Sequence, residues 1–197
     1  SERAGRLSTF EPVRPRFASR RVSEYGRPMA NAQDLIEEII DTTTDAGTMA
    51  VLVKRPADPP PNGGDWPVVL MFHDGPGIRT ATHEFMRKLA GAGYVVVTPD
   101  LYHRQGRLLG VEPAARAADP SLTGKMWGWL SSLTDDGIQD DGDRALAAAG
   151  IDADTPIATI GFCLGARAVF RRMMREPTRV VAGATWPEEA RRLRTIL

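Results

Sequence analysis

The sequence places its single cysteine between two glycines, in the run Gly161-Phe162-Cys163-Leu164-Gly165. A nucleophile flanked in this way is typical of a sharp turn from a strand into a helix. The glycines allow neighbouring backbone to approach closely, and the amino end of the helix carries a partial positive charge that favours a thiolate. We therefore predict that Cys163 is a nucleophile. The alternative is a small apolar side chain buried between a strand and a helix.

Attack of a thiol on a carbonyl group builds negative charge on the carbonyl oxygen, so such a site also needs amide donors. The amide of Leu164 directly follows the nucleophile and is the first candidate. The second candidate is the amide of Gly75, in the loop at 73–77 that follows an apolar run at 68–72. Because glycine and proline are also common in ordinary turns, a plain connection between strand and helix is the alternative for this loop.

The elements that must position these groups follow an alternating pattern. Apolar runs at 68–72, 94–98 and 157–162 predict strands buried on both faces of a sheet. We predict helices near 82–91, 125–133, 138–149 and 164–175, a last strand at 180–185, and two strands joined by a turn between 36 and 56. Residues 101–124 are expected to be irregular. Together these elements indicate an α/β fold with a mostly parallel sheet and flanking helices.

Composition fits one globular domain of 197 residues with a formal net charge of zero. This gives no argument for a nucleic-acid or membrane partner, and no apolar run approaches the roughly 20 residues that span a bilayer. A single cysteine excludes an internal disulfide and suits the cytoplasm. Residues 1–28 hold seven arginines and three glutamates and predict a disordered basic extension, with a transit peptide or a nucleic-acid arm as alternatives. Residues 29–197 are then the folded domain.

Three stretches of the sequence resemble the dienelactone hydrolase family of the α/β-hydrolases. They are PVVLMFHDGPG at 67–77, EFMRKLAGAGYVVVTPDLYHRQG at 84–106 and IATIGFCLGARA at 157–168. The resemblance extends over roughly residues 35–186. It implies hydrolysis of activated esters or lactones of small, carboxylate-bearing substrates by a cysteine, histidine and aspartate, without a metal or organic cofactor.

The resemblance also implies roles for individual residues. Cys163 would attack the substrate carbonyl while the amides of Leu164 and Gly75 hold the oxyanion. Asp74 would accept the proton or hydrogen bond of the resting thiol. Arg104 matches the position that binds the substrate carboxylate, for which a planar guanidinium fork is well suited. Independently of the resemblance, Tyr102 is expected to line an apolar substrate pocket. Asp74 as a turn cap and Arg104 as a solvated charge are the alternatives.

The chain departs from the family pattern after the nucleophile. α/β-Hydrolases place the catalytic acid and then the histidine downstream, whereas all three histidines here, His73, His83 and His103, precede Cys163. We therefore expect a domain that lacks its last strands, with an open sheet edge after 180–185 that the tail covers or that leads to self-association. His73 or His103 could substitute for the base, since both follow predicted strands.

These observations predict a hydrolase of small activated esters or lactones. Because the family's acid and histidine are not found after Cys163, turnover by this chain is expected to be weak or absent. A protein that binds ligands or reacts through its thiol without turnover is the alternative from another class. A fragment that does not fold is the third possibility.

Overall fold

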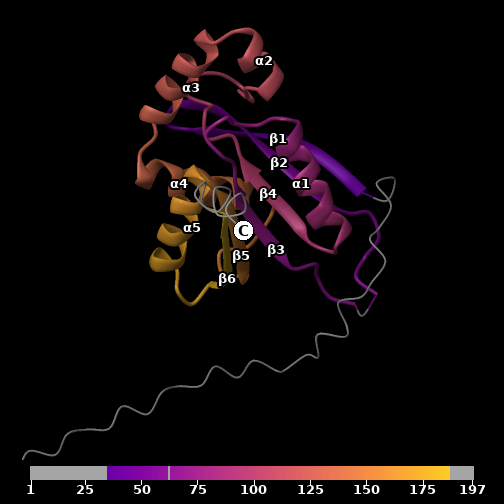
Figure 1. The fold of residues 1–197 in the computed structure, drawn as a ribbon. Helices are drawn as coiled ribbons and strands as arrows, with labels where there is room; N and C mark the ends of the chain where they lie inside the picture. Colours follow the sequence, from indigo (N-terminus) through magenta and orange to yellow (C-terminus); the bar gives the residue numbers. More distant parts are fainter. Residues whose placement is uncertain (1–34, 62, 187–197) are drawn as a thin grey trace, which may run out of the picture.

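The computed structural model describes residues 35–61 and 63–186, which form one six-stranded sheet with helices on both faces (Figure 1). The strands are β1 (Leu35–Thr44), β2 (Gly47–Pro56), β3 (Val68–Phe72), β4 (Val95–Pro99), β5 (Ile157–Phe162) and β6 (Val180–Trp186). The helices are α1 (Thr80–Gly91), α2 (Pro113–Ala118), α3 (Ser121–Ser131), α4 (Asp135–Ala148) and α5 (Leu164–Arg175). The basic extension expected at 1–28 and the tail at 187–197 lie outside the described residues.

The strands are ordered β1-β2-β4-β3-β5-β6 across the sheet. β1 and β2 form an antiparallel hairpin whose turn ends at Gly47, with a φ of 110° that favours glycine. β2 is antiparallel to β4, while β4, β3, β5 and β6 run parallel to one another. The prediction of an α/β fold with a mostly parallel sheet is confirmed.

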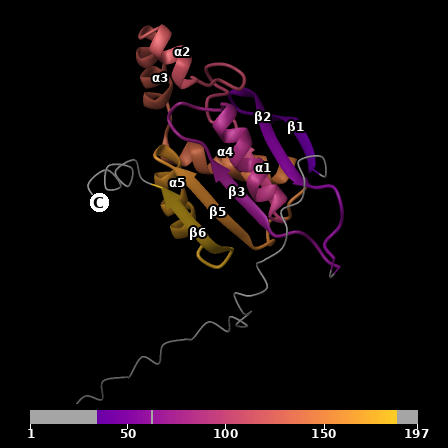
Figure 2. The ribbon, with the colours of Figure 1, turned by 45° about the vertical axis from the view of Figure 1, so that its right-hand side comes forward.

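Alternate side chains of the central strands enter two cores on opposite faces of the sheet. Leu70 and Phe72 of β3 pack in the larger core, together with residues of α4 and α5. Met71, between them, packs in the smaller core with Met86 and Ala90 of α1. Figure 2 shows α1 on one face and α4 and α5 on the other. Both faces of β3 are therefore buried, which explains its uninterrupted apolar sequence.

The segment at 101–124 differs from the prediction, because it contains the short helix α2 and the beginning of α3. α2 begins at Pro113, whose fixed φ suits the first helical position, and it buries none of its residues. A helix without a buried face lacks the apolar repeat by which helices are recognised in a sequence. The helix predicted to begin at 125 is α3, which begins at Ser121.

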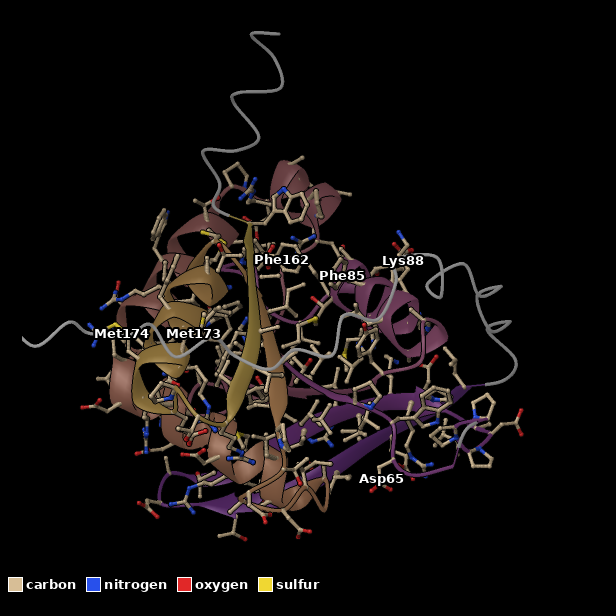
Figure 3. All side chains as sticks on the ribbon, turned by 90° about the horizontal axis from the view of Figure 1, so that it is seen from below. Asp65, Phe85, Lys88, Phe162, Met173 and Met174 are labelled. Atoms are coloured by element: carbon tan, nitrogen blue, oxygen red, sulfur yellow. The ribbon has the colours of Figure 1, made fainter. Side chains whose placement is uncertain are left out.

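β6 is the edge of the sheet within the described residues, and much of it is accessible to solvent. Val181 and Trp186 of β6 are about half exposed, and Met174 of α5 is 82% exposed. Figure 3 shows Met173 and Met174 on α5, which packs against β6. The self-association expected at this edge stays a prediction. In residues 35–61 and 63–186, the longest helices are too short or too polar to cross a membrane.

Candidate active site

Cys163 is the single residue between the end of β5 and the start of α5. Its backbone has φ 51° and ψ −108°, in the region that side-chain-bearing residues rarely adopt. Such a conformation costs about 1–3 kcal/mol and persists where the surrounding structure enforces it. The Cys163 N–H donates to the Trp186 carbonyl at 3.1 Å, and the Cys163 carbonyl accepts from the Ala166 N–H at 3.0 Å. Neighbouring backbone therefore holds the turn, and the cysteine side chain is exposed.

The two glycines that flank the turn are required by close backbone contacts. A Cβ added at Gly161 would lie 2.2 Å from the carbonyl oxygen of Gly165. A Cβ added at Gly165 would lie 2.4 Å from the Phe72 carbonyl oxygen and 3.0 Å from that of His73. The first turn of α5 consequently packs directly on the end of β3, which places the turn at Cys163 beside the loop that begins at His73.

This loop carries the second proposed oxyanion donor, Gly75. Among the described residues, neither the Gly75 amide nor the Leu164 amide donates a backbone hydrogen bond. The Gly75 carbonyl accepts from the buried Tyr102 hydroxyl at 2.6 Å, and the Gly77 N–H donates to the Asp74 carbonyl at 3.0 Å. Hydrogen bonds thus fix the loop on both sides of Gly75, while its amide remains available to a substrate oxygen.

Tyr102 lies close enough to both Asp74 and Cys163 to respond to their charges. Burial raises the pKa of the Tyr102 hydroxyl above its ordinary range, and negative charge on Asp74 and on Cys163 raises it further. The Tyr102 ring also packs against Trp129, with ring centroids 5.6 Å apart. Tyr102 is thus the residue that links Asp74 and Cys163, and the assignment of all three to one site stays a prediction.

The Asp74 carboxylate has a partner that the sequence did not indicate. Its Oδ2 accepts a hydrogen bond from Nη2 of Arg79, the residue at the amino end of α1. Its Oδ1 is buried, without a hydrogen-bond partner among the described residues. The only signal in the sequence was a basic residue five positions after Asp74, which is too common a pattern to be informative.

The rings of His73 and His103 have hydrogen-bond partners of their own. His73 is buried, and both of its ring nitrogens face backbone: Nδ1 lies 2.8 Å from the Asp74 carbonyl, and Nε2 accepts from the Leu101 N–H at 3.3 Å. The His103 ring is buried against Asp141, with 3.3 Å between Nε2 and the carboxylate. Burial lowers the pKa of His83, and the nearby positive charges of Lys54 and Arg87 lower it further. The substitution of His73 or His103 for the base stays a prediction.

We expect buried His73 to make folding sensitive to acid. Burial lowers the pKa of its ring below the ordinary value of 6.5, against a smaller opposing effect of Asp74. The unfolded chain thus binds the proton more readily, and the free energy of unfolding should fall below about pH 6.5, by up to about 1.4 kcal/mol per pH unit from this group. In His73→Gln, the amide oxygen can still accept from the Leu101 N–H. Denaturant titrations of this variant between pH 5 and 7 should show a free energy of unfolding that changes less steeply with pH. An equal slope in both proteins would contradict this account.

Arg104 makes a bidentate ion pair inside the protein. Its two terminal nitrogens donate to the carboxylate of Asp141 at 2.7 Å and 3.0 Å. Asp141 lies on α4 with only 1% of its side chain exposed, whereas Arg104 is 32% exposed. The sequence did not single out Asp141 among the several aspartates of this helix, because only the packing of α4 against the end of β4 selects it.

Residues 49–188 match the Dienelactone hydrolase family. The chain belongs to the dienelactone hydrolase family. The matched range begins inside β2, extends just past β6 and contains both the loop at 73–77 and the turn at Cys163. The family resemblance noted in the sequence is confirmed, and the α/β-hydrolase fold with it.

Relatives of this family member are considerably longer. A Methylorubrum extorquens protein assigned as a carboxymethylenebutenolidase is 29% identical over 130 residues, which are 64% of this chain and 42% of the relative. A solved structure from Klebsiella pneumoniae, assigned as a dienelactone hydrolase, has a TM-score of 0.58 at 23% identity and covers 76% of this chain and 58% of its own. A dienelactone hydrolase-like promiscuous phosphotriesterase from metagenomic libraries gives 0.56 at 20% identity, covering 78% and 59%. This chain thus spans less than two thirds of the length of each of these three proteins.

Proposed function

We propose that this chain reacts with small activated esters or lactones, with Cys163 as the nucleophile. The strained backbone at Cys163 is the observation that carries this proposal, because φ is 51° between two glycines that close contacts require. A cysteine that served only as an apolar filler would have no need of this conformation, and its side chain would be buried rather than exposed.

The reaction would proceed through a thioester. The sulfur of Cys163 attacks the carbonyl carbon, its proton passes to the Asp74 carboxylate, and the carbonyl electrons move to the oxygen, where the amides of Leu164 and Gly75 donate hydrogen bonds. The carbonyl then re-forms, the bond to the leaving oxygen breaks, and the alcohol takes the proton from Asp74. Water releases the acid by the same sequence of steps, and the thiol is restored.

The identity of the base limits the expected rate. A carboxylate is a much weaker base than an imidazole, and the rings of His73 and His103 have hydrogen-bond partners of their own. Acylation by an ester with a good leaving group should therefore be faster than hydrolysis of the thioester. This arrangement also favours a second candidate function, in which the exposed thiol reacts with oxidants or electrophiles without turnover.

The test of the function is the time course of p-nitrophenyl acetate cleavage, followed past one equivalent of product. Sustained release supports hydrolysis. A burst that ends at one equivalent supports the second candidate, in which the thiol is acylated and not regenerated. If neither release nor labelling of the thiol occurs, the proposal that Cys163 is a nucleophile fails.

Arg104 is proposed to bind a carboxylate of the substrate. A guanidinium has five N–H groups, and Asp141 accepts hydrogen bonds from two of them. We expect Arg104→Lys to raise KM about tenfold for a carboxylate-bearing ester, such as a p-nitrophenyl hemisuccinate, and to leave KM for p-nitrophenyl acetate nearly unchanged. Equal losses on the two esters would show instead that Arg104 acts only through its contact with Asp141.

A further inference from the structure

The ion pair between Arg79 and Asp74 is held in place by the start of α1. The Arg79 N–H donates to the Thr82 hydroxyl at 3.3 Å, and its carbonyl accepts from the N–H groups of Thr82 at 2.8 Å and His83 at 3.2 Å. The side chains of Arg79 and Asp74 are 15% and 18% exposed. A guanidinium anchored on a helix end and mostly shielded from water can fix the orientation of a carboxylate.

The pair lies next to the turn at Cys163. Gly165, two residues after Cys163, packs against the backbone of Phe72 and His73, and Asp74 is the next residue. Tyr102 is affected by negative charge on both Asp74 and Cys163, and its hydroxyl bonds the carbonyl of Gly75. A charge on Asp74 will therefore act on the thiol unless a cation compensates it.

We propose that Arg79 is a positioning residue: it binds Oδ2 of Asp74, compensates the charge of that carboxylate beside the Cys163 thiol, and leaves Oδ1 as the proton acceptor. The proposal rests on the proposed function, because the acceptor is needed when the thiol attacks a carbonyl group. Arg79 itself need not touch the substrate. Without it, Asp74 would place an uncompensated negative charge beside the sulfur and oppose formation of the thiolate.

Alkylation of the thiol by iodoacetamide tests this role directly, since Cys163 is the only cysteine of the chain. The rate is measured between pH 6 and 10 for the full chain and for Arg79→Gln. We expect the midpoint of the pH profile to move upward, with alkylation about tenfold slower below the midpoint. Arg87→Gln is the matched control, because Arg87 lies on the same helix and pairs with Glu37 instead. The midpoint of its alkylation profile should equal that of the chain without substitutions.

A folded Arg79→Gln protein with an unchanged midpoint would overturn the proposal. If that variant does not fold, Arg79→Lys replaces it, and the expected change has the same sign and is about threefold, because the shorter ammonium side chain compensates Asp74 less well. An unchanged midpoint in Arg79→Lys would then be decisive against it. Failure of the proposed function would give a different result, because p-nitrophenyl acetate would then not acylate the chain without substitutions. The alkylation profiles would still show whether Arg79 controls the reactivity of the thiol.

Discussion

Cys163→Ala is expected to reduce the release of p-nitrophenol from p-nitrophenyl acetate by at least about a thousandfold, to the rate of the uncatalysed reaction. The reason is that the whole reaction passes through a bond to the sulfur, so the remaining amide donors cannot replace it. The measurement is the burst and the steady-state rate under identical conditions. Release by the alanine variant at the rate of the unmodified chain would place the reaction elsewhere.

Two further variants separate chemistry from folding. Cys163→Ser nearly keeps the size of the side chain but offers a hydroxyl, which needs a stronger base than a carboxylate. Its rate of p-nitrophenol release should therefore be close to that of the alanine variant. Cys163→Gly should be equally inactive, yet its free energy of unfolding should rise by about 1 kcal/mol, because glycine adopts a φ of 51° without strain. A loss of stability in this variant would mean that the turn is not strained.

Gly165→Ala is expected to destabilise the fold by about 3 kcal/mol or more. The new methyl group would lie 2.4 Å from the Phe72 carbonyl oxygen, and this contact is with backbone at the end of β3 rather than with a side chain that could rotate away. α5 would have to move off the sheet, which would also displace the turn at Cys163. Denaturant titration measures the loss, and the acylation burst should fall with it.

Gly128→Ala is the matched control for this substitution. Gly128 lies inside α3, and a Cβ added there meets no atom within 4 Å. The alanine variant should therefore be more stable than the unmodified chain by about 0.5–1 kcal/mol, since alanine favours the helix. If both glycine variants changed stability by the same amount, close packing at Gly165 could not be the cause.

The sequence by itself determined most of the strands and helices and the turn at Cys163. β3, β5 and α5 were predicted at 68–72, 157–162 and 164–175, and the structure has the same limits. These are local properties, because an apolar run marks a strand buried on both faces and paired glycines mark a turn with close backbone contacts. α2 was not predicted, since it buries no face and so leaves no apolar repeat.

Only the tertiary structure decided which charged groups meet. Asp74 and Arg104 were chosen from the sequence, but their partners, Arg79 and Asp141, depend on how helices pack against strand ends. Likewise, His73 follows a buried strand as a catalytic base could, yet the fold directs both of its ring nitrogens to backbone. Backbone conformation is set mainly by neighbours in the chain, whereas ion pairs and hydrogen bonds join residues that lie far apart in it. The sequence therefore specified the turn that carries Cys163, and the packing specified which side chains surround it.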